Sequence, residues 1–213
     1  MAPVVNSQQS VPVSDRGARS REQIMDATVR VMIDRRTIDI TLGDIAGASN
    51  LNGALVRYYF GSKDGLLLAV LMRSAEKGIT QLRSLVEIDM PPDQKLRYHI
   101  AGMVNTYSSN PYFTRLRDHF KKSPDSPECE RVTNEFNRPF MALQSELLRQ
   151  GIQSGHFRPV DYRCFYLAII GACNAIVDLS NSAKGFEGFG QGAPLKSDYI
   201  EYVTDLHLRG LLK

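Results

Sequence analysis

Residues 41–67 read TLGDIAGASNLNGALVRYYFGSKDGLL, and this stretch contains the signals for a short helix followed by a tight turn. Thr41 with Asp44 three residues later is a helix start of the capping-box type, and the short apolar run after Thr41 indicates a first helix. Asn50 tolerates the left-handed conformation that ends a helix, and Asn52 is a good N-cap for the next helix. The sequence therefore predicts two helices that meet at a turn of a few residues.

The second short helix is expected from about Gly53 to Tyr59, and Ser62 is expected to cap a longer helix that runs toward Leu85. Two short helices at a tight turn, the second with a polar and cationic outer surface, are typical of a recognition helix that enters the DNA major groove. The residues expected to pack these helices together are Ile45, Ala46, Val56 and Phe60. The pattern predicts a helix-turn-helix.

The same stretch resembles the signature of the TetR family of transcriptional regulators. That signature has Thr-x-x-x-Ile-Ala, then a recognition helix that ends in aromatic-aromatic-Phe, then Ser-Lys-acid-x-Leu. The matching residues are Thr41, Ile45, Ala46, Tyr58, Tyr59, Phe60, Ser62, Lys63, Asp64 and Leu66. The resemblance covers about residues 20–71. It implies a homodimer that binds a palindromic operator on double-stranded DNA, acts as a repressor and is released by a small-molecule effector, with an activator or a co-repressor mechanism left open.

The recognition helix departs from the family pattern. This chain has Asn50, Gly53, Ala54, Leu55 and Arg57 where the family commonly has Gly, Lys or Arg, Gly, Thr and Tyr. These changes argue against borrowing the operator sequence of any relative. The DNA-binding candidates that the resemblance implies are Thr41, Asn52, Gly53, Ala54, Leu55, Arg57, Tyr58 and Lys63.

Three of these candidates have roles that chemistry suggests. Arg57 is expected to contact a guanine edge or a phosphate, and a solvated surface arginine is the alternative. Thr41 and Lys63 stand at helix starts, where free backbone N–H groups help to hold phosphates. For Thr41, a role as N-cap alone is the alternative.

The chain is expected to be all-α and to have three parts: a flexible N-terminal arm at 1–18, a helix-turn-helix domain at 19–66, and a helical effector-binding and dimerisation domain at 67–213. The first helix is expected to begin at Ser20, with Gln23 completing a capping box. The helices expected after Pro91-Pro92 span 93–108, 111–120, 128–154, 161–180 and 197–212, with a glycine-rich, mobile connection at 181–196.

The expected helix at 161–180 is apolar on nearly all sides, so it has to be buried both by its own domain and by a second copy of the chain. Together with the last helix it is expected to form a four-helix interface like that of the family. The residues assigned to this interface are Phe165, Ala168, Ile169, Ala172, Cys173, Ile176, Tyr199, Tyr202, Val203 and Leu206.

Large apolar side chains on the middle helices form the candidate ligand pocket, although a plain core is the alternative for each of them. They are Met103, Tyr107, Phe113, Phe120, Phe136, Phe140 and Met141. A nearby basic group could bind an acidic effector, but a solvated helix face is the favoured interpretation for its members, which are Arg97, His99, Arg115, Arg117 and His119.

Composition and motifs argue against other classes of protein. A net charge of +3 does not by itself identify a nucleic-acid binder, and three irregularly spaced cysteines make no disulfide framework or zinc site. The four histidines lack metal-binding spacing, no catalytic set is visible, and no cofactor is expected. We therefore expect a non-enzyme in the bacterial cytoplasm, at the nucleoid and not in the membrane. The alternative is a helical ligand-binding or scaffold protein that has lost DNA binding.

Overall fold

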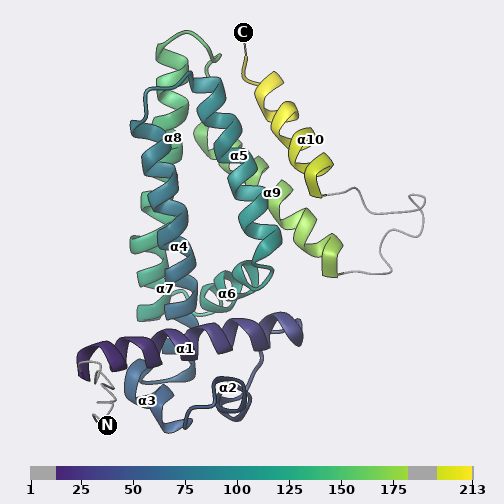
Figure 1. Ribbon diagram of the computed structural model, residues 1–213. Helices are drawn as coiled ribbons and strands as arrows, with labels where there is room; N and C mark the ends of the chain where they lie inside the picture. Colours follow the sequence, from purple (N-terminus) through teal and green to yellow (C-terminus); the bar gives the residue numbers. More distant parts are fainter. Residues whose placement is uncertain (1–12, 182–195, 213) are drawn as a thin grey trace, which may run out of the picture. The chain divides into compact units, whose positions relative to one another are not determined.

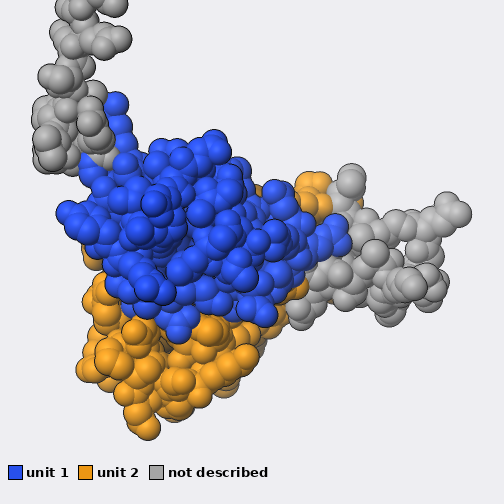
Figure 2. Space-filling view, turned by 90° about the horizontal axis from the view of Figure 1, so that it is seen from below, with its two compact units in different colours: residues 1–69 blue, residues 70–213 orange. Residues whose placement is uncertain are grey.

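The computed structural model describes residues 13–181 and 196–212, except for the side chains at 13–16 and 178–181. The expected mobile connection at 181–196 and the first twelve residues of the expected arm thus lie almost entirely outside the described residues. The chain divides into two compact units, Met1–Ala69 and Val70–Lys213 (Figure 2). None of the helices in the described part of the chain has the length and apolar content that a bilayer crossing requires.

The first unit consists of three helices and the start of a fourth: α1 (Val13–Asp34), α2 (Leu42–Ser49), α3 (Ala54–Phe60) and α4 (Lys63–Glu87), which continues into the second unit (Figure 1). The prediction that α1 begins at Ser20 was wrong, because the chain is helical from Val13. Arg16, Ala18 and Arg19 favour the helix by their propensity alone and carry no apolar stripe that would reveal it.

Helix α1 provides much of the core of the first unit. Ile24, Ala27, Val31 and Met32 are buried on one face, as their spacing predicted. The polar side chains beside this face bind the end of α2: Gln23 Nε2 donates to Ser49 O at 2.7 Å, and Arg30 Nη2 donates to Ala48 O at 3.2 Å. Since the last carbonyls of a helix have no partner within it, these two bonds hold the C-terminus of α2 against α1.

The second unit contains the rest of α4 and the elements α5 (Pro92–Ser109), α6 (Tyr112–Lys121), α7 (Pro127–Arg131), the π-helix η1 (Val132–Asn137), α8 (Arg138–Gln153), α9 (Tyr162–Asn181) and α10 (Lys196–Arg209). The single helix expected at 128–154 is therefore a continuous helical run with a wide turn inside it. Pro139 explains that turn, because it lacks an N–H and its ring clashes with the carbonyl four residues earlier in a regular α-helix.

Helix α5 lies at the centre of the second unit and packs against α8, α9 and α10 (Figure 1). The loop after α8 is fixed by Phe157, which is fully buried and packs directly on Gly151 of α8. The chain end returns to this loop, because Arg158 N donates to Leu211 O at 2.8 Å. These contacts tie the end of α10 to the rest of the unit.

Candidate functional site

The start of α2 is held by a reciprocal pair of hydrogen bonds, as the capping-box signal predicted. Asp44 N donates to Thr41 Oγ1 at 3.2 Å, and Thr41 N donates to Asp44 Oδ2 at 2.8 Å. Arg35 Nη2 lies 2.8 Å from Asp44 Oδ1. The bond from the Thr41 backbone N–H, helped by the Thr41 side chain and Arg35, keeps the pKa of Asp44 below its usual range. The Thr41 side chain is thus engaged with Asp44, and it remains exposed at the start of α2.

The turn between α2 and α3 has the conformation expected from its two asparagines. Asn50 adopts the left-handed conformation, with φ 54° and ψ 26°. Asn52 Oδ1 accepts a hydrogen bond from Ala54 N at 2.9 Å, and Leu55 N donates to Asn52 O at 2.9 Å. Both predictions are confirmed, and the turn fixes the angle between the two short helices through bonds to side chains and backbone.

A second tight connection joins α3 to α4, and it contains a requirement that sequence reasoning missed. Gly61 has φ 73°, and Ser62 Oγ accepts from Gly65 N at 2.9 Å, as expected for a helix cap. A Cβ on Gly65 would lie 2.1 Å from Phe60 O. Glycine at this position, the unspecified one in the Ser-Lys-acid-x-Leu pattern, therefore allows α4 to begin directly against the end of the recognition helix.

Five of the eight candidate DNA-binding residues are exposed to solvent, and three of these five lie on α3. Tyr58 is 79% exposed, and its neighbour Val56 is buried, at 1%. The other exposed candidates are Thr41, Asn52, Ala54 and Arg57, whereas Gly53, Leu55 and Lys63 are partly buried. Lys63 Nζ lies 3.8 Å from Asp39 Oδ1. Of the expected core residues Ile45 and Val56 are buried, while Ala46 and Phe60 are half-buried, with the Arg21 guanidinium 5.2 Å from the centre of the Phe60 ring.

A cavity of about 70 Å³ lies within the second unit. The solvent-exposed Gln81 and Tyr98 are part of its wall and mark its opening. Met103, Tyr107, Phe113, Phe136 and Phe140 of the predicted pocket line this cavity, whereas Phe120 and Met141 do not. The other lining residues are Ser74, Ala75, Gly78, Leu82, Leu85, His99, Gly102, Thr106, Tyr166 and Ile170.

Two glycines on facing helices help to leave this space open. Gly78 of α4 and Gly102 of α5 line the cavity, and a Cβ built on either would meet no atom within 4 Å. Glycine is costly inside a helix, where alanine would be more stable by roughly 0.5–1 kcal/mol. The present packing does not require glycine at either position, because a Cβ would fit there without a clash. The effect of the two glycines is therefore to enlarge the cavity.

Two members of the basic group, expected on a solvated face, are buried beside this cavity. His99 is 4% exposed, its Nε2 lies 3.0 Å from Gln144 Nε2, and burial lowers its pKa to about 4. Arg117 is 6% exposed and its Nη1 donates to Tyr107 Oη at 2.7 Å. The expectation was therefore wrong for these two residues. The spacing could have revealed it, because Arg117 falls on the apolar stripe of α6 formed by Phe113, Leu116 and Phe120.

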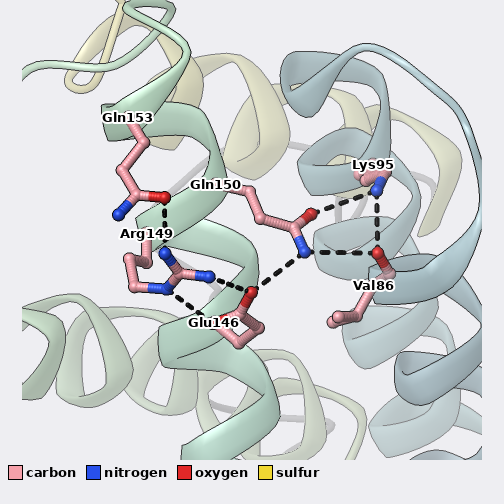
Figure 3. A network of polar contacts seen from close by, with 6 residues as sticks. All are labelled: Val86, Lys95, Glu146, Arg149, Gln150 and Gln153. Atoms are coloured by element: carbon pink, nitrogen blue, oxygen red, sulfur yellow. Dashed lines mark hydrogen bonds and ion pairs between the residues drawn. The ribbon is translucent and has the colours of Figure 1, made fainter.

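A second buried cation holds the C-terminal end of α4, and sequence reasoning did not predict it. Lys95 of α5 is 6% exposed, and its Nζ donates to Val86 O at 2.9 Å and to Gln150 Oε1 at 3.1 Å. Figure 3 shows that Gln150 continues this network to Glu146, which also pairs with Arg149. The network connects the C-terminus of α4 with α5 and α8, and so anchors one end of the cavity wall.

The residues assigned to the dimer interface divide into two groups. Phe165, Ile169, Cys173, Ile176 and Val203 are buried within the chain itself, while Ala172 and Tyr199 are half-buried. Tyr199 Oη donates to Ala172 O at 2.7 Å, so α9 and α10 pack on each other. Ala168, Tyr202 and Leu206 are exposed, and the large apolar side chain of Leu167 is 67% exposed. The main apolar stripe of α9 therefore belongs to its own core, and a second, outward face stays open.

These features define a class: one-component regulators in which a helix-turn-helix is joined to a helical body that contains a cavity. The family described as "Tetracyclin repressor-like, C-terminal domain" matches residues 89–213. The chain belongs to the tetracycline-repressor family of transcriptional regulators, with its DNA-binding helix-turn-helix.

Individual relatives agree with this assignment. The chain is 25% identical over 206 residues to the HTH-type transcriptional repressor NicS of Pseudomonas putida, covering 91% of this chain and 92% of that protein. Among solved structures, a TetR family regulator from Marinobacter aquaeolei has a TM-score of 0.66 at 22% identity, covering 94% of this chain and 100% of that one. FadR from Bacillus subtilis in complex with stearoyl-CoA has a TM-score of 0.69 at 16% identity, covering 89% and 98%.

Proposed function

We propose that this protein is a homodimeric repressor that binds a palindromic operator and is released by a small-molecule effector held in the cavity of its helical body. The observation that carries this proposal is the presentation of α3. A helix with a buried Val56 and exposed Arg57 and Tyr58 is fixed at both ends by capped turns. A rigid helix with a polar outer surface is what reading the major groove requires.

Contacts to DNA divide into two kinds in this proposal. Arg57, with Leu55 and the residues at the start of α3, reads base edges. Thr41 and Lys63 hold phosphates beside the groove, and Tyr58 adds a further phosphate contact. The exposure of Thr41 at the start of α2 and the exposed part of the Lys63 side chain support these roles.

The partner surface of the proposed homodimer is the outward face of α9 and α10. Leu167, Ala168 and Ala175 are exposed on α9, and Tyr202 and Leu206 are exposed on α10. Large apolar side chains that are more than half exposed on adjacent helices are typical of a protein interface. Four such helices, two from each protomer, bury this face and space the two recognition helices for one turn of DNA, roughly 34–36 Å.

Effector release is proposed to act through α4. Only two residues separate this single helix from the end of α3, and its later turns carry Ser74, Gly78 and Leu82 into the cavity wall. A ligand that fits only a shifted α4 favours a state of the dimer with a different head separation. The structure of FadR from Bacillus subtilis in complex with stearoyl-CoA supports a small-molecule ligand for a protein of this fold.

The experiment that tests the proposal is selection of bound duplexes from a random DNA pool, followed by titration of the selected sequence at several salt concentrations. We expect an inverted repeat that binds two protomers, with affinity that falls steeply as salt rises. Failure of the folded protein to enrich any sequence would favour the alternative, a ligand-binding or scaffold protein that no longer binds DNA. Gly53 and Leu55 in the recognition helix keep that alternative open.

A further inference from the structure

Arg117 is a buried cation whose hydrogen bonds are incompletely satisfied. It is 6% exposed, one nitrogen donates to Tyr107 Oη at 2.7 Å, and its Nε has no partner. Its guanidinium carbon lies 5.9 Å from the centre of the Phe136 ring. Within residues 13–181 and 196–212, leaving aside the side chains not described, no ion pair joins Arg117 to a carboxylate. Arginine stays charged in proteins, and buried charges are normally paired. Burial opposes the charge of Arg117, while Tyr107, Tyr166 and the neighbouring Asp118 favour it and raise its pKa. Among the described side chains, the guanidinium therefore has no carboxylate in direct contact.

The two side chains that Arg117 contacts are also walls of the cavity. Tyr107 and Phe136 both line it, so the guanidinium lies directly behind the cavity surface. Burial raises the pKa of Tyr107, which therefore keeps its proton. Since the Tyr107 oxygen accepts from Arg117, its own O–H remains free to donate, and the positive charge behind it strengthens that donor.

The remaining wall is neutral and largely apolar. The described lining contains no Asp, Glu, Lys or Arg, and His99 is uncharged at neutral pH because burial lowers its pKa to about 4. Arg117 is a charged side chain that contacts two residues of this lining, Tyr107 and Phe136. The cavity has a volume of about 70 Å³. Met103, a flexible side chain in the wall, can move to admit a larger apolar body.

We propose that the effector is an apolar monocarboxylate, whose carboxylate accepts a hydrogen bond from Tyr107 and is paired with Arg117. This inference rests on the proposed function, because it names the chemical class of ligand for the same cavity. The aromatic side chains Phe113, Phe136 and Phe140 then cover the apolar body. The carboxylate supplies the negative counter-charge for the Arg117 guanidinium. Acids and neutral ligands of the same shape are therefore distinguished by their charge alone.

Calorimetric titration of the full-length protein with matched pairs tests this inference. The probes are benzoate against benzamide and octanoate against octanamide. We expect at least one acid to bind about tenfold or more tightly than its amide, because a hydrogen bond to a charged group is lost with the amide. Equal affinities within each pair, tighter binding of the amides, or no binding of either acid at millimolar concentration would overturn the proposal.

Variants separate a binding role of Arg117 from a structural one. Arg117→Met removes the charge and keeps the bulk, and we expect it to lower the acid affinity to that of the amide while leaving the amide affinity unchanged. Arg117→Lys should restore part of the preference. Arg97→Met is the matched control, since Arg97 is an exposed arginine paired with Asp205 at 3.2 Å, and it should keep the full preference.

The melting temperature without probe gives an independent measurement. If the Arg117 guanidinium is unpaired in the ligand-free protein, the Arg117→Met variant should have a melting temperature equal to or above that of the wild type, because an uncompensated buried charge has been removed. A lower melting temperature together with retained acid preference would overturn the proposal. DNA binding by the same proteins is measured in parallel: acid selectivity without DNA release contradicts the proposed effector mechanism alone, whereas DNA release by amides as readily as by acids contradicts this inference alone.

Discussion

Arg57→Ala is the substitution that most directly tests how the recognition helix reads DNA. Arg57 is exposed on α3, and the neighbouring Val56 provides the packing of that helix. Truncation therefore leaves the free energy of unfolding within about 0.5 kcal/mol of the wild type. A bidentate contact to a guanine is worth about 1–3 kcal/mol, so two half-sites lose about 2–6 kcal/mol. At roughly 1.4 kcal/mol per factor of ten, even the lower value weakens binding about thirtyfold.

Lys63→Ala is the matched comparison, because it removes a cation that is expected to contact phosphate. Lys63 lies 3.8 Å from the exposed carboxylate of Asp39, and exposed pairs of this kind contribute little to folding. Each phosphate contact contributes about 0.9 to the slope of log K against log salt, so a dimer should lose about 1.8 from that slope. Base preference should not change, since phosphate contacts carry no sequence information directly.

Fluorescence anisotropy with a labelled, selected duplex measures both effects over a series of salt concentrations. Point variants of the duplex identify the base that Arg57 reads, because Arg57→Ala should no longer discriminate at that position. Unchanged affinity and unchanged discrimination in Arg57→Ala would refute base reading by this residue. An unchanged salt slope in Lys63→Ala would remove the phosphate contact from the proposal.

Four further outcomes follow from packing, exposure and charge. Gly151→Ala should lower the free energy of unfolding by about 1–3 kcal/mol in denaturant titrations, because its Cβ would lie 2.0 Å from the buried ring of Phe157. The Gly102→Ala variant should instead have a free energy of unfolding higher by roughly 0.5–1 kcal/mol, because the added Cβ would meet nothing within 4 Å. A lower free energy of unfolding would contradict the described cavity. Leu206→Glu should turn the dimer into a monomer in sedimentation experiments, since Leu206 is 56% exposed on the proposed interface; an intact dimer would exclude that face. Because burial lowers the pKa of His99, the unfolded chain takes up a proton near pH 6.5 and the folded chain only near pH 4. The free energy of unfolding should therefore fall by up to about 3 kcal/mol as the pH is lowered from 6.5 to 4. The His99→Gln variant should lack this loss.

The helix-turn-helix was predictable almost to the residue because its signals are local. The capping box of Thr41 and Asp44, the left-handed Asn50 and the cap at Asn52 each depend on atoms within three residues of one another. The error at the start of α1 also has a local explanation. The start of α1 was misplaced because a polar helix turn has no apolar periodicity to reveal it.

The cavity was predicted less completely, for a different reason. Five of the seven suggested residues line it, because large apolar side chains on middle helices point to the core wherever that core is. Phe120 and Met141 do not, and the sequence could not separate them, since lining a void depends on what the facing helices leave empty. The glycines Gly78 and Gly102 contribute to that void by lacking a side chain.

The sequence alone determined that this chain is helical, where most of its helices begin and end, and that it carries the family's DNA-binding motif, because capping and periodicity act over one or two turns. Tertiary structure decided which of the two apolar faces of α9 points into its own core, leaving Leu167 outside and Ile169 inside. It also paired the buried Arg117 of α6 with Tyr107 of α5. Such choices depend on contacts between helices distant in sequence, whose shared packing no local pattern encodes.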